Sequence, residues 1–342
     1  NILDFGSSKI RFSVFDHQLN ETYSISKIIK LEENDLSHYK EVKNIIKKAE
    51  KNISSHIEDI ILTLDTSELI SIDISLKKNL DRKTDINKIY ESLVLEVSQI
   101  INTFYNKVEI LHIVLCRCII DNNTYFELPT DKKYINNIKV DFKLICFPKY
   151  IINKIKKNFN ENNINITNIF CTSYVKSLSY LRKLNIKNLS FIEIGLKKTC
   201  FISFEKNKLK IIQTIPIGGI HITNDISKIF KISFDEAEKI KKSFNKSETE
   251  FSYENNNLEN NFSVTEILSK NISVDILKKV ILYRVQEIID LAFKKSNIHL
   301  YEKNLKKSDL FFIGEGSLIL NNNSFYLNDK FEFNTLSFYN ET

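Results

Sequence analysis

The chain has 342 residues and 42% of them are hydrophobic, which excludes a disordered protein and allows sizeable buried cores. Its 49 basic and 43 acidic residues give a formal net charge of +6, but the two signs are interleaved, which disfavours a nucleic-acid-binding stripe. Because a single core rarely grows to this length, two lobes with an insertion are the expected organisation.

The five cysteines predict buried free thiols in a reducing cytoplasm. Their number is odd, the sequence has no CxxC pair, and no His stands at ligand spacing, which disfavours a disulfide framework and a zinc site. Cys116 and Cys118 are two apart in a strand-like run and are expected to face the same side. The sequence contains no Met, so its natural start is expected to be missing, and no signal peptide is recognised at its beginning. Its apolar runs fall short of the ~20 residues of a spanning helix.

Residues 1–68 predict a mixed α/β lobe. Two strands joined at a Gly6-Ser7-Ser8 turn run from Ile2 to Phe15, where apolar and polar residues alternate. An extended stretch near 25–29 continues the sheet. Apolar residues then recur at helical spacing over 42–49, and 57–64 has the pattern of another strand.

Residues 69–148 predict a compact α+β unit inserted into this first lobe, which continues through 149–187. The helix of the unit begins with a cap at Thr84 or Asp85. The predicted elements from 69 onward are a strand at 69–76, a helix at 85–103, strands at 108–120, 125–128 and 138–147, a helix at 150–159, a strand at 166–170 and a helix at 173–184.

Residues 188–317 predict a second lobe that repeats the first. Leu3-Asp4-Phe5-Gly6 and Ile192-Glu193-Ile194-Gly195 each place an acid and a Gly where a strand meets a turn, which favours an internal duplication. The other predicted features are strands at 190–204 and 208–217, a mobile polar loop at 247–261, a helix at 273–293, a strand at 310–313, and an irregular C-terminal segment at 318–342.

The glycines are few, and each stands at a strand end or a turn. In a chain rich in Asn and Lys, such placement indicates either a turn with positive φ or main chain lying close to a ligand. Adjacent turn amides can also form an anion-binding nest. For any single glycine a tight turn is the favoured interpretation. For the set, a nucleotide site is favoured: Gly6, Gly195, Gly218, Gly219, Gly314 and Gly316.

The motifs stand in the order of a known family. Asp4 to Lys9 resembles the first phosphate-binding hairpin of actin-like ATPases, 193–199 resembles a worn second hairpin, and 313–317 resembles the adenosine motif. The stretch from Pro216 to Lys241, with Pro-Ile-Gly-Gly, Thr-Asn-Asp-Ile and Ala-Glu-Lys-Ile-Lys, is similar to a signature of the FtsA family and its pilus relative PilM. The resemblance covers nearly the whole chain. It implies an actin-like (ribonuclease H-like) two-lobe α/β fold with an inserted α+β subdomain in the first lobe.

The resemblance also implies ATP and Mg²⁺ as ligands. Asp4 and Glu193 would hold Mg²⁺ through its water shell; the alternative for each is a solvated acid beside a turn. Glu238 and Lys241 share a helix face and would contact ribose and base, or form an ordinary surface ion pair. The full set of implied ATP-binding residues is Gly6, Ser7, Ser8, Lys9, Gly195, Lys198, Thr199, Gly218, Gly219, Glu238, Lys241, Gly314, Gly316 and Ser317.

The second phosphate turn departs from the family pattern. Leu196 and Lys197 stand where the family has Gly, and Cys200 stands where an Asp is usual. Side chains at 196 and 197 would crowd a phosphate group. ATP binding is therefore expected, but hydrolysis is expected to be weak or absent, and no catalytic base can be named.

The family resemblance implies partners in cell division. Arg284, with Glu287 nearby, would pair with acids of the C-terminal tail of FtsZ; the alternative is a surface ion pair on one helix. The chain would polymerise, recruit later division proteins through the inserted unit, and lie on the cytoplasmic face of the inner membrane at the division site. No nucleic acid is expected as a partner. The membrane helix of the family is not visible in 318–342, so either the sequence stops early or this version lacks one.

Three alternatives remain open. A sugar kinase or chaperone ATPase of the same fold would need an intact second hairpin and a catalytic acid. A PilM-like scaffold of a type IV pilus would bind a short peptide of a pilus membrane protein. A degenerate actin-like scaffold would bind no nucleotide.

Overall fold

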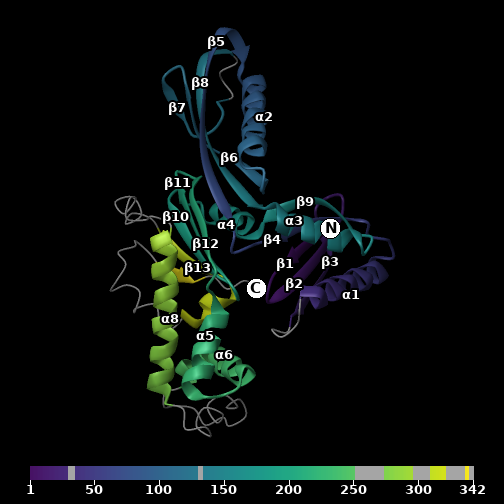
Figure 1. Cartoon of the computed structure of the whole chain (residues 1–342), viewed down its shortest axis with the longest axis vertical. Helices are drawn as coiled ribbons and strands as arrows, with labels where there is room; N and C mark the ends of the chain where they lie inside the picture. The colour runs from purple at the N-terminus through teal and green to yellow at the C-terminus, as the bar shows by residue number, and fades with distance from the viewer. Residues whose placement is uncertain (30–34, 130–133, 251–272, 296–308, 321–335, 339–342) are drawn as a thin grey trace. The chain divides into compact units, whose positions relative to one another are not determined.

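The computed structural model describes residues 1–29, 35–129, 134–250, 273–295, 309–320 and 336–338. It divides into two compact units (Figure 1). The first unit holds Asn1–Lys187 and the hairpin tip Phe204–Ile212, and the second holds Asn188–Ser203 and Gln213–Thr342.

The first lobe is built on a five-stranded sheet of order β3-β2-β1-β4-β9. β1 is antiparallel to β2 and parallel to β4, and β4 is parallel to β9. Fully buried Leu3, Ile10 and Phe12 alternate with polar neighbours and form its core. The elements are β1 Ile2–Phe5, β2 Lys9–Phe15, β3 Glu21–Ile28, α1 Asp35–Ile53, β4 Asp59–Leu64, α3 Lys149–Asn160, β9 Asn165–Cys171 and α4 Thr172–Leu184.

The inserted unit is an antiparallel sheet of order β5-β8-β6-β7 with α2 packed on one face. Asp85 caps α2, because its carboxylate accepts a hydrogen bond from the Asn87 amide at 2.8 Å. Two predicted strands are present with different bounds: β5 continues to Asp85, beyond the predicted end at residue 76, and β7 ends at Tyr125, where the predicted strand was to begin. The elements are β5 Ile70–Asp85, α2 Ile86–Phe104, β6 Val108–Ile120, β7 Asn123–Tyr125 and β8 Tyr134–Pro148.

The expectation that Cys116 and Cys118 face the same side was wrong. The register of β6 against β8 shifts between Leu115 and Arg117, and such a bulge re-aims the side chains on either side of it. Cys118 lies in the core beneath α2, whereas Cys116 Sγ lies 3.4 Å from the carbonyl oxygen of Leu209. All five cysteines are free thiols, as predicted, but Cys116 is only half-buried and the other four are buried.

The second lobe repeats the strand order of the first: a three-stranded hairpin array with two parallel strands added beside its first strand, in the order β12-β11-β10-β13-β14. This repetition is what an internal duplication predicts. The elements are β10 Leu189–Ile194, β11 Thr199–Glu205, β12 Lys208–Ile215, α5 Gly219–Phe230, α6 Phe234–Glu250, α8 Val274–Lys295, β13 Asp309–Ile313, a 3-10 helix Glu315–Leu320 and β14 Leu336–Phe338.

Two features of the second lobe differ from the sequence predictions. α6 continues to Glu250, so the polar stretch predicted as a loop at 247–261 begins inside a helix; its remainder, 251–261, lies outside the described residues. The C-terminal segment is not wholly irregular, because Leu336–Phe338 pairs in parallel with β13. In the part of the chain that the structure describes, no helix has the length and apolarity needed to cross a membrane.

Candidate nucleotide-binding site

Asp4 stands near the end of β1 and is held by three neighbours. Its Oδ2 accepts from Arg11 Nη1 at 3.0 Å, across the hairpin. Its Oδ1 accepts from the hydroxyls of Thr63 at 3.1 Å and Thr172 at 3.3 Å. The carboxylate keeps 18% of its side-chain surface exposed, so it is oriented by the protein and still partly open to solvent.

The turn that follows Asp4 has room only for glycine at its first position. A Cβ on Gly6 would lie 2.5 Å from the carbonyl oxygen of Lys9, which starts β2. Ser7 is exposed, and Ser8 accepts a hydrogen bond at its carbonyl from the Ile29 amide at 2.9 Å. The predicted first hairpin therefore exists as a closed turn with its tip in solvent.

The second hairpin turn, between β10 and β11, is bound to the start of α5. The Gly195 amide donates to the Lys198 carbonyl at 2.9 Å and closes the turn. The Gly219 amide donates in turn to the Gly195 carbonyl, also at 2.9 Å. Thr199 is fully buried, and its hydroxyl donates to the Ile217 carbonyl at 2.8 Å. The described contacts of Thr199 are thus with the protein, and its contact with ATP stays a prediction.

Gly218 packs directly on this turn. A Cβ at Gly218 would lie 2.5 Å from Gly195 O, 2.8 Å from Leu196 O and 2.8 Å from Lys198 N, and all three atoms belong to the main chain. The glycine is required by contact between two stretches of backbone. That requirement holds with or without a ligand.

The predicted adenosine motif packs on the other side of β10. Gly314 has a φ of +87°, and added Cβ atoms at Gly314 and Gly316 would lie 2.8 and 2.7 Å from the Ile194 carbonyl oxygen. Ser317 donates from its hydroxyl to Gly314 O at 2.7 Å. Glu193, the last but one residue of β10, is 8% exposed, so the interpretation of a solvated acid was wrong for this residue. Four of the six glycines therefore pack around the end of β10 and the hairpin turn that contains a fifth, Gly195.

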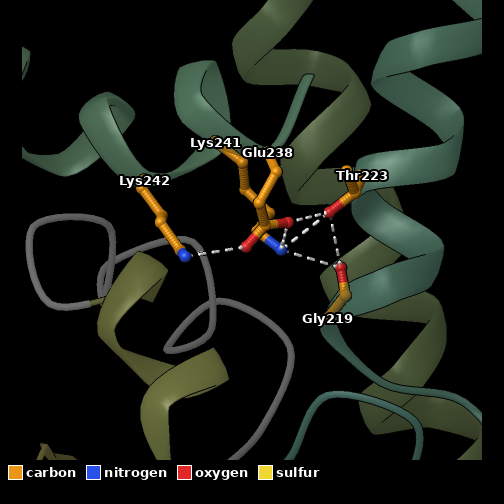
Figure 2. Close-up of polar contacts among 5 residues, drawn as sticks. All are labelled: Gly219, Thr223, Glu238, Lys241 and Lys242. Atoms are coloured by element: carbon orange, nitrogen blue, oxygen red, sulfur yellow. Dashed lines mark hydrogen bonds and ion pairs between the residues drawn. The ribbon is translucent and has the colours of Figure 1, made fainter. Parts of the chain in front are cut away.

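Glu238 and Lys241 of α6 form a part-buried cluster with the start of α5 (Figure 2). The Lys241 ammonium donates to Gly219 O at 3.1 Å and Thr223 Oγ1 at 2.7 Å, and it pairs with Glu238 Oε2 at 2.6 Å. Thr223 donates to the same carboxylate oxygen at 2.5 Å, and Lys242 lies 3.4 Å from Oε1. With side chains only 14% and 12% exposed, Glu238 and Lys241 are not the ordinary surface pair of the alternative interpretation.

Burial and charge oppose each other in this cluster. Burial raises the pKa of Glu238, but the charge and hydrogen bond of Lys241, with the Thr223 hydroxyl, outweigh it and lower the pKa overall. For Lys241, burial lowers the pKa and the attraction to Glu238 offsets only part of that effect. Three acceptors surround the Lys241 ammonium, so the geometry is that of a charged pair.

Arg284 of α8 is bound by two acids of its own lobe. Its guanidinium donates two hydrogen bonds to the Asp225 carboxylate of α5, at 2.5 and 3.0 Å, and its Nη1 donates to Glu287 at 2.6 Å. The alternative of a pair with Glu287 on one helix is present, and the second acid was not foreseen. An acidic partner would have to compete for this guanidinium.

Sequence reasoning missed several residues of these clusters. The contact of Arg11 with Asp4 could have been predicted from the sequence, because a short turn at Gly6–Lys9 places Arg11 opposite Asp4 in the hairpin. Thr63, Thr172 and Thr223 reach their partners from separate elements, and their identity and spacing carry no signal of those contacts.

Comparison with solved structures shows which class of protein this fold belongs to. The chain resembles the solved PilM-PilN complex of type IV pilus biogenesis with a TM-score of 0.62, at 13% sequence identity, over 98% of this chain and 86% of that chain. The protein has the fold of actin-like ATPases, as predicted.

Comparison with a protein-family model and with curated proteins shows which family the sequence is similar to. Residues 190–322 match the model of cell division protein FtsA, which confirms the resemblance found in the motifs. The chain is 29% identical to FtsA of Bacillus subtilis over 152 residues, 44% of this chain and 34% of that protein. It is 24% identical to FtsA of Staphylococcus epidermidis over 202 residues, 58% of this chain and 43% of that protein. The chain thus spans well under half the length of these curated relatives.

Proposed function

We propose that the protein is a cell-division adaptor of the FtsA kind, which polymerises and links the FtsZ ring to the cytoplasmic face of the inner membrane. The observation that supports this function most directly is the match of residues 190–322 to the FtsA model. The inserted unit is the part that would recruit later division proteins. Membrane attachment would be peripheral.

We also propose that the protein binds Mg-ATP and hydrolyses it weakly or not at all. The donor set fits such a ligand: Asp4 is oriented and accessible, and Lys9 and Lys198 bring positive charge to the two phosphate turns. Asp4 and Glu193 would hold the water shell of Mg²⁺, a hard cation that keeps several waters. Leu196 and Lys197 in the second turn are the residues that argue against efficient hydrolysis.

Asp4→Asn is expected to weaken the Mg²⁺-dependent part of ATP binding by about 10–100-fold, as loss of an outer-shell partner of a metal does. The measurement is a titration with fluorescent ATP in Mg²⁺ and again in EDTA. Asp16→Asn is the matched control, since Asp16 accepts bonds only within its own turn in the described contacts, from Gln18 and Asn20. If the natural chain shows no affinity for ATP, the nucleotide proposal fails and the adaptor proposal stands.

The FtsZ tail is proposed to bind at the α5–α8 face of the second lobe. Exposed Ile229 on α5, with Ile276 and Tyr283 one heptad apart on α8, offer apolar surface near Arg284. An acidic, partly apolar tail fits this combination, provided that it takes the guanidinium from Asp225 or Glu287.

Arg284→Ala is expected to weaken binding of a labelled FtsZ tail peptide by tenfold or more, because a charge-assisted contact is worth about 1.5–3 kcal/mol. Fluorescence anisotropy with the full chain measures it. Arg182→Ala removes the same charge from an exposed site at the end of α4 and serves as the control. Equal affinity in Arg284→Ala and in the control would exclude this face, whatever the outcome with ATP.

A further inference from the structure

Three consecutive residues at the start of α4 are each held by a different part of the first unit. The Cys171 amide donates to His112 Nε2 of β6 at 3.0 Å. The Thr172 hydroxyl donates to Asp4 of β1 at 3.3 Å. Ser173 donates to the Asp65 carboxylate, which follows β4, through its amide at 3.1 Å and its hydroxyl at 2.6 Å.

His112 is the contribution of the inserted unit to this junction. Its ring packs edge-on against Tyr174, with centroids 4.8 Å apart, and tilted against Phe170 at 5.6 Å. Because Nε2 accepts a hydrogen bond, the ring is neutral and carries its proton on Nδ1. Burial lowers the pKa of His112 to about 4, although the Asp65 carboxylate acts in the opposite direction. The ring is therefore a stable acceptor at neutral pH.

We propose that His112 is a positioning residue that couples the inserted subdomain to Asp4 through the start of α4. The inference rests on the proposed function, since the coupling would respond to a ligand bound at Asp4. Cys171 and Thr172 are consecutive where β9 meets α4, so a backbone shift that carries Thr172 toward or away from Asp4 also moves the Cys171 amide relative to His112.

A hydrated cation at Asp4 would start this change. Asp4 would hold such a cation through carboxylate oxygens that already accept three bonds, so its bond with the Thr172 hydroxyl would weaken. A weaker bond at Thr172 would allow the first turn of α4 to move. The hydrogen bond from the Cys171 amide to His112 would then transmit this movement to β6 of the inserted sheet. The subdomain would then differ in stability between the loaded and empty states.

The test compares hydrogen exchange of the full chain in peptides covering β6 and the start of α4. Asp4→Asn, without nucleotide, is expected to raise exchange in β6 around residue 112 by about threefold or more. In His112→Phe, which keeps a ring but loses the acceptor, the same Asp4 change is expected to leave β6 unaltered. His112→Gln, whose amide oxygen can accept the Cys171 bond, is expected to restore the response.

A substitution that removes the hydrogen bond between Thr172 and Asp4 keeps the proposal testable if His112→Phe does not fold. Thr172→Val has the same shape without the hydroxyl and is expected to remove the β6 response as well. Thr167→Val is the control, because its hydroxyl bonds Ile60 O instead. An Asp4→Asn effect that persists in His112→Phe or Thr172→Val, or one that is absent from the otherwise natural chain, overturns the proposal.

The Mg-ATP arm separates this proposal from the proposed function. If Mg-ATP binds, its addition is expected to change β6 exchange in the natural chain but not in His112→Phe. If Mg-ATP does not bind, the nucleotide proposal fails alone, and the Asp4→Asn comparison still decides whether the link exists.

Discussion

Gly218→Ala is expected to cost the second unit about 3 kcal/mol or more, since overpacking commonly costs 1–3 kcal/mol even where neighbours can move. Here the neighbours are three main-chain atoms within 2.8 Å of the added Cβ. A side chain could rotate away, but the carbonyls of Gly195 and Leu196 accept the bonds that hold α5 to the turn. Relief of the clash would therefore break those bonds too.

Gly219→Ala is the matched control for this prediction. Its added Cβ would meet Gly195 O and Lys241 Nζ at 3.6 Å, which is ordinary contact. The position begins α5, where Ala in place of Gly is neutral or stabilising by up to about 1 kcal/mol. Exchange of β10 and α5 peptides in urea measures the second unit apart from the first. Equal stability of the two variants would contradict the packing account of Gly218.

The clash at Gly218 also means that a Gly218 variant is a poor test of nucleotide binding. Loss of ATP binding in Gly218→Ala follows from a disrupted turn as readily as from a blocked ligand. Asp4→Asn is the cleaner test, because it removes the charge, which weakens the hydrogen bonds that Asp4 accepts, and it adds no bulk to a packed turn.

The hairpins, the helices and the lobe duplication were predictable because they depend on local pattern. The alternation from Lys9 to Phe15 and the Gly6 turn specify a hairpin whichever way the chain folds later. Six glycines were predicted to share a nucleotide site, which stays a prediction; Gly218, Gly219, Gly314 and Gly316 pack near the turn that contains Gly195, and Gly6 lies in the other hairpin. Their described contacts are with protein backbone, and the sequence cannot distinguish such contacts from those with a phosphate.

What the sequence could not predict depends on partners brought in by tertiary packing. Thr223 stands about one turn into α5 and looks like an ordinary helix residue, yet it lies at the centre of the Lys241 cluster. The bulge at Cys116 breaks a period that the sequence continues without interruption. β14 is three residues long and exists only because β13 offers it an edge. Such features have no local signature.

Lys241→Met is expected to destabilise the second unit by about 2–3 kcal/mol. Breaking one side of a buried ion pair usually costs 3–5 kcal/mol, because the remaining charge stays buried without compensation. The cost should be lower here, since Lys242 lies 3.4 Å from the other Glu238 oxygen and the pair is not fully buried. Exchange of α5 and α6 peptides in urea measures the change.

The double variant Glu238→Gln with Lys241→Met is the decisive comparison. It removes both charges and leaves Gln able to accept the Thr223 hydroxyl, so it should recover most of the lost stability. In the natural chain the lowered pKa of Glu238 adds stability above the unfolded value of 4.5, and this is lost as pH falls through the folded value. The double variant should lack that acid-dependent loss. If Lys241→Met costs less than about 1 kcal/mol, the cluster does not join α5 to α6, and its two side chains are free for the ribose and base that the resemblance implies.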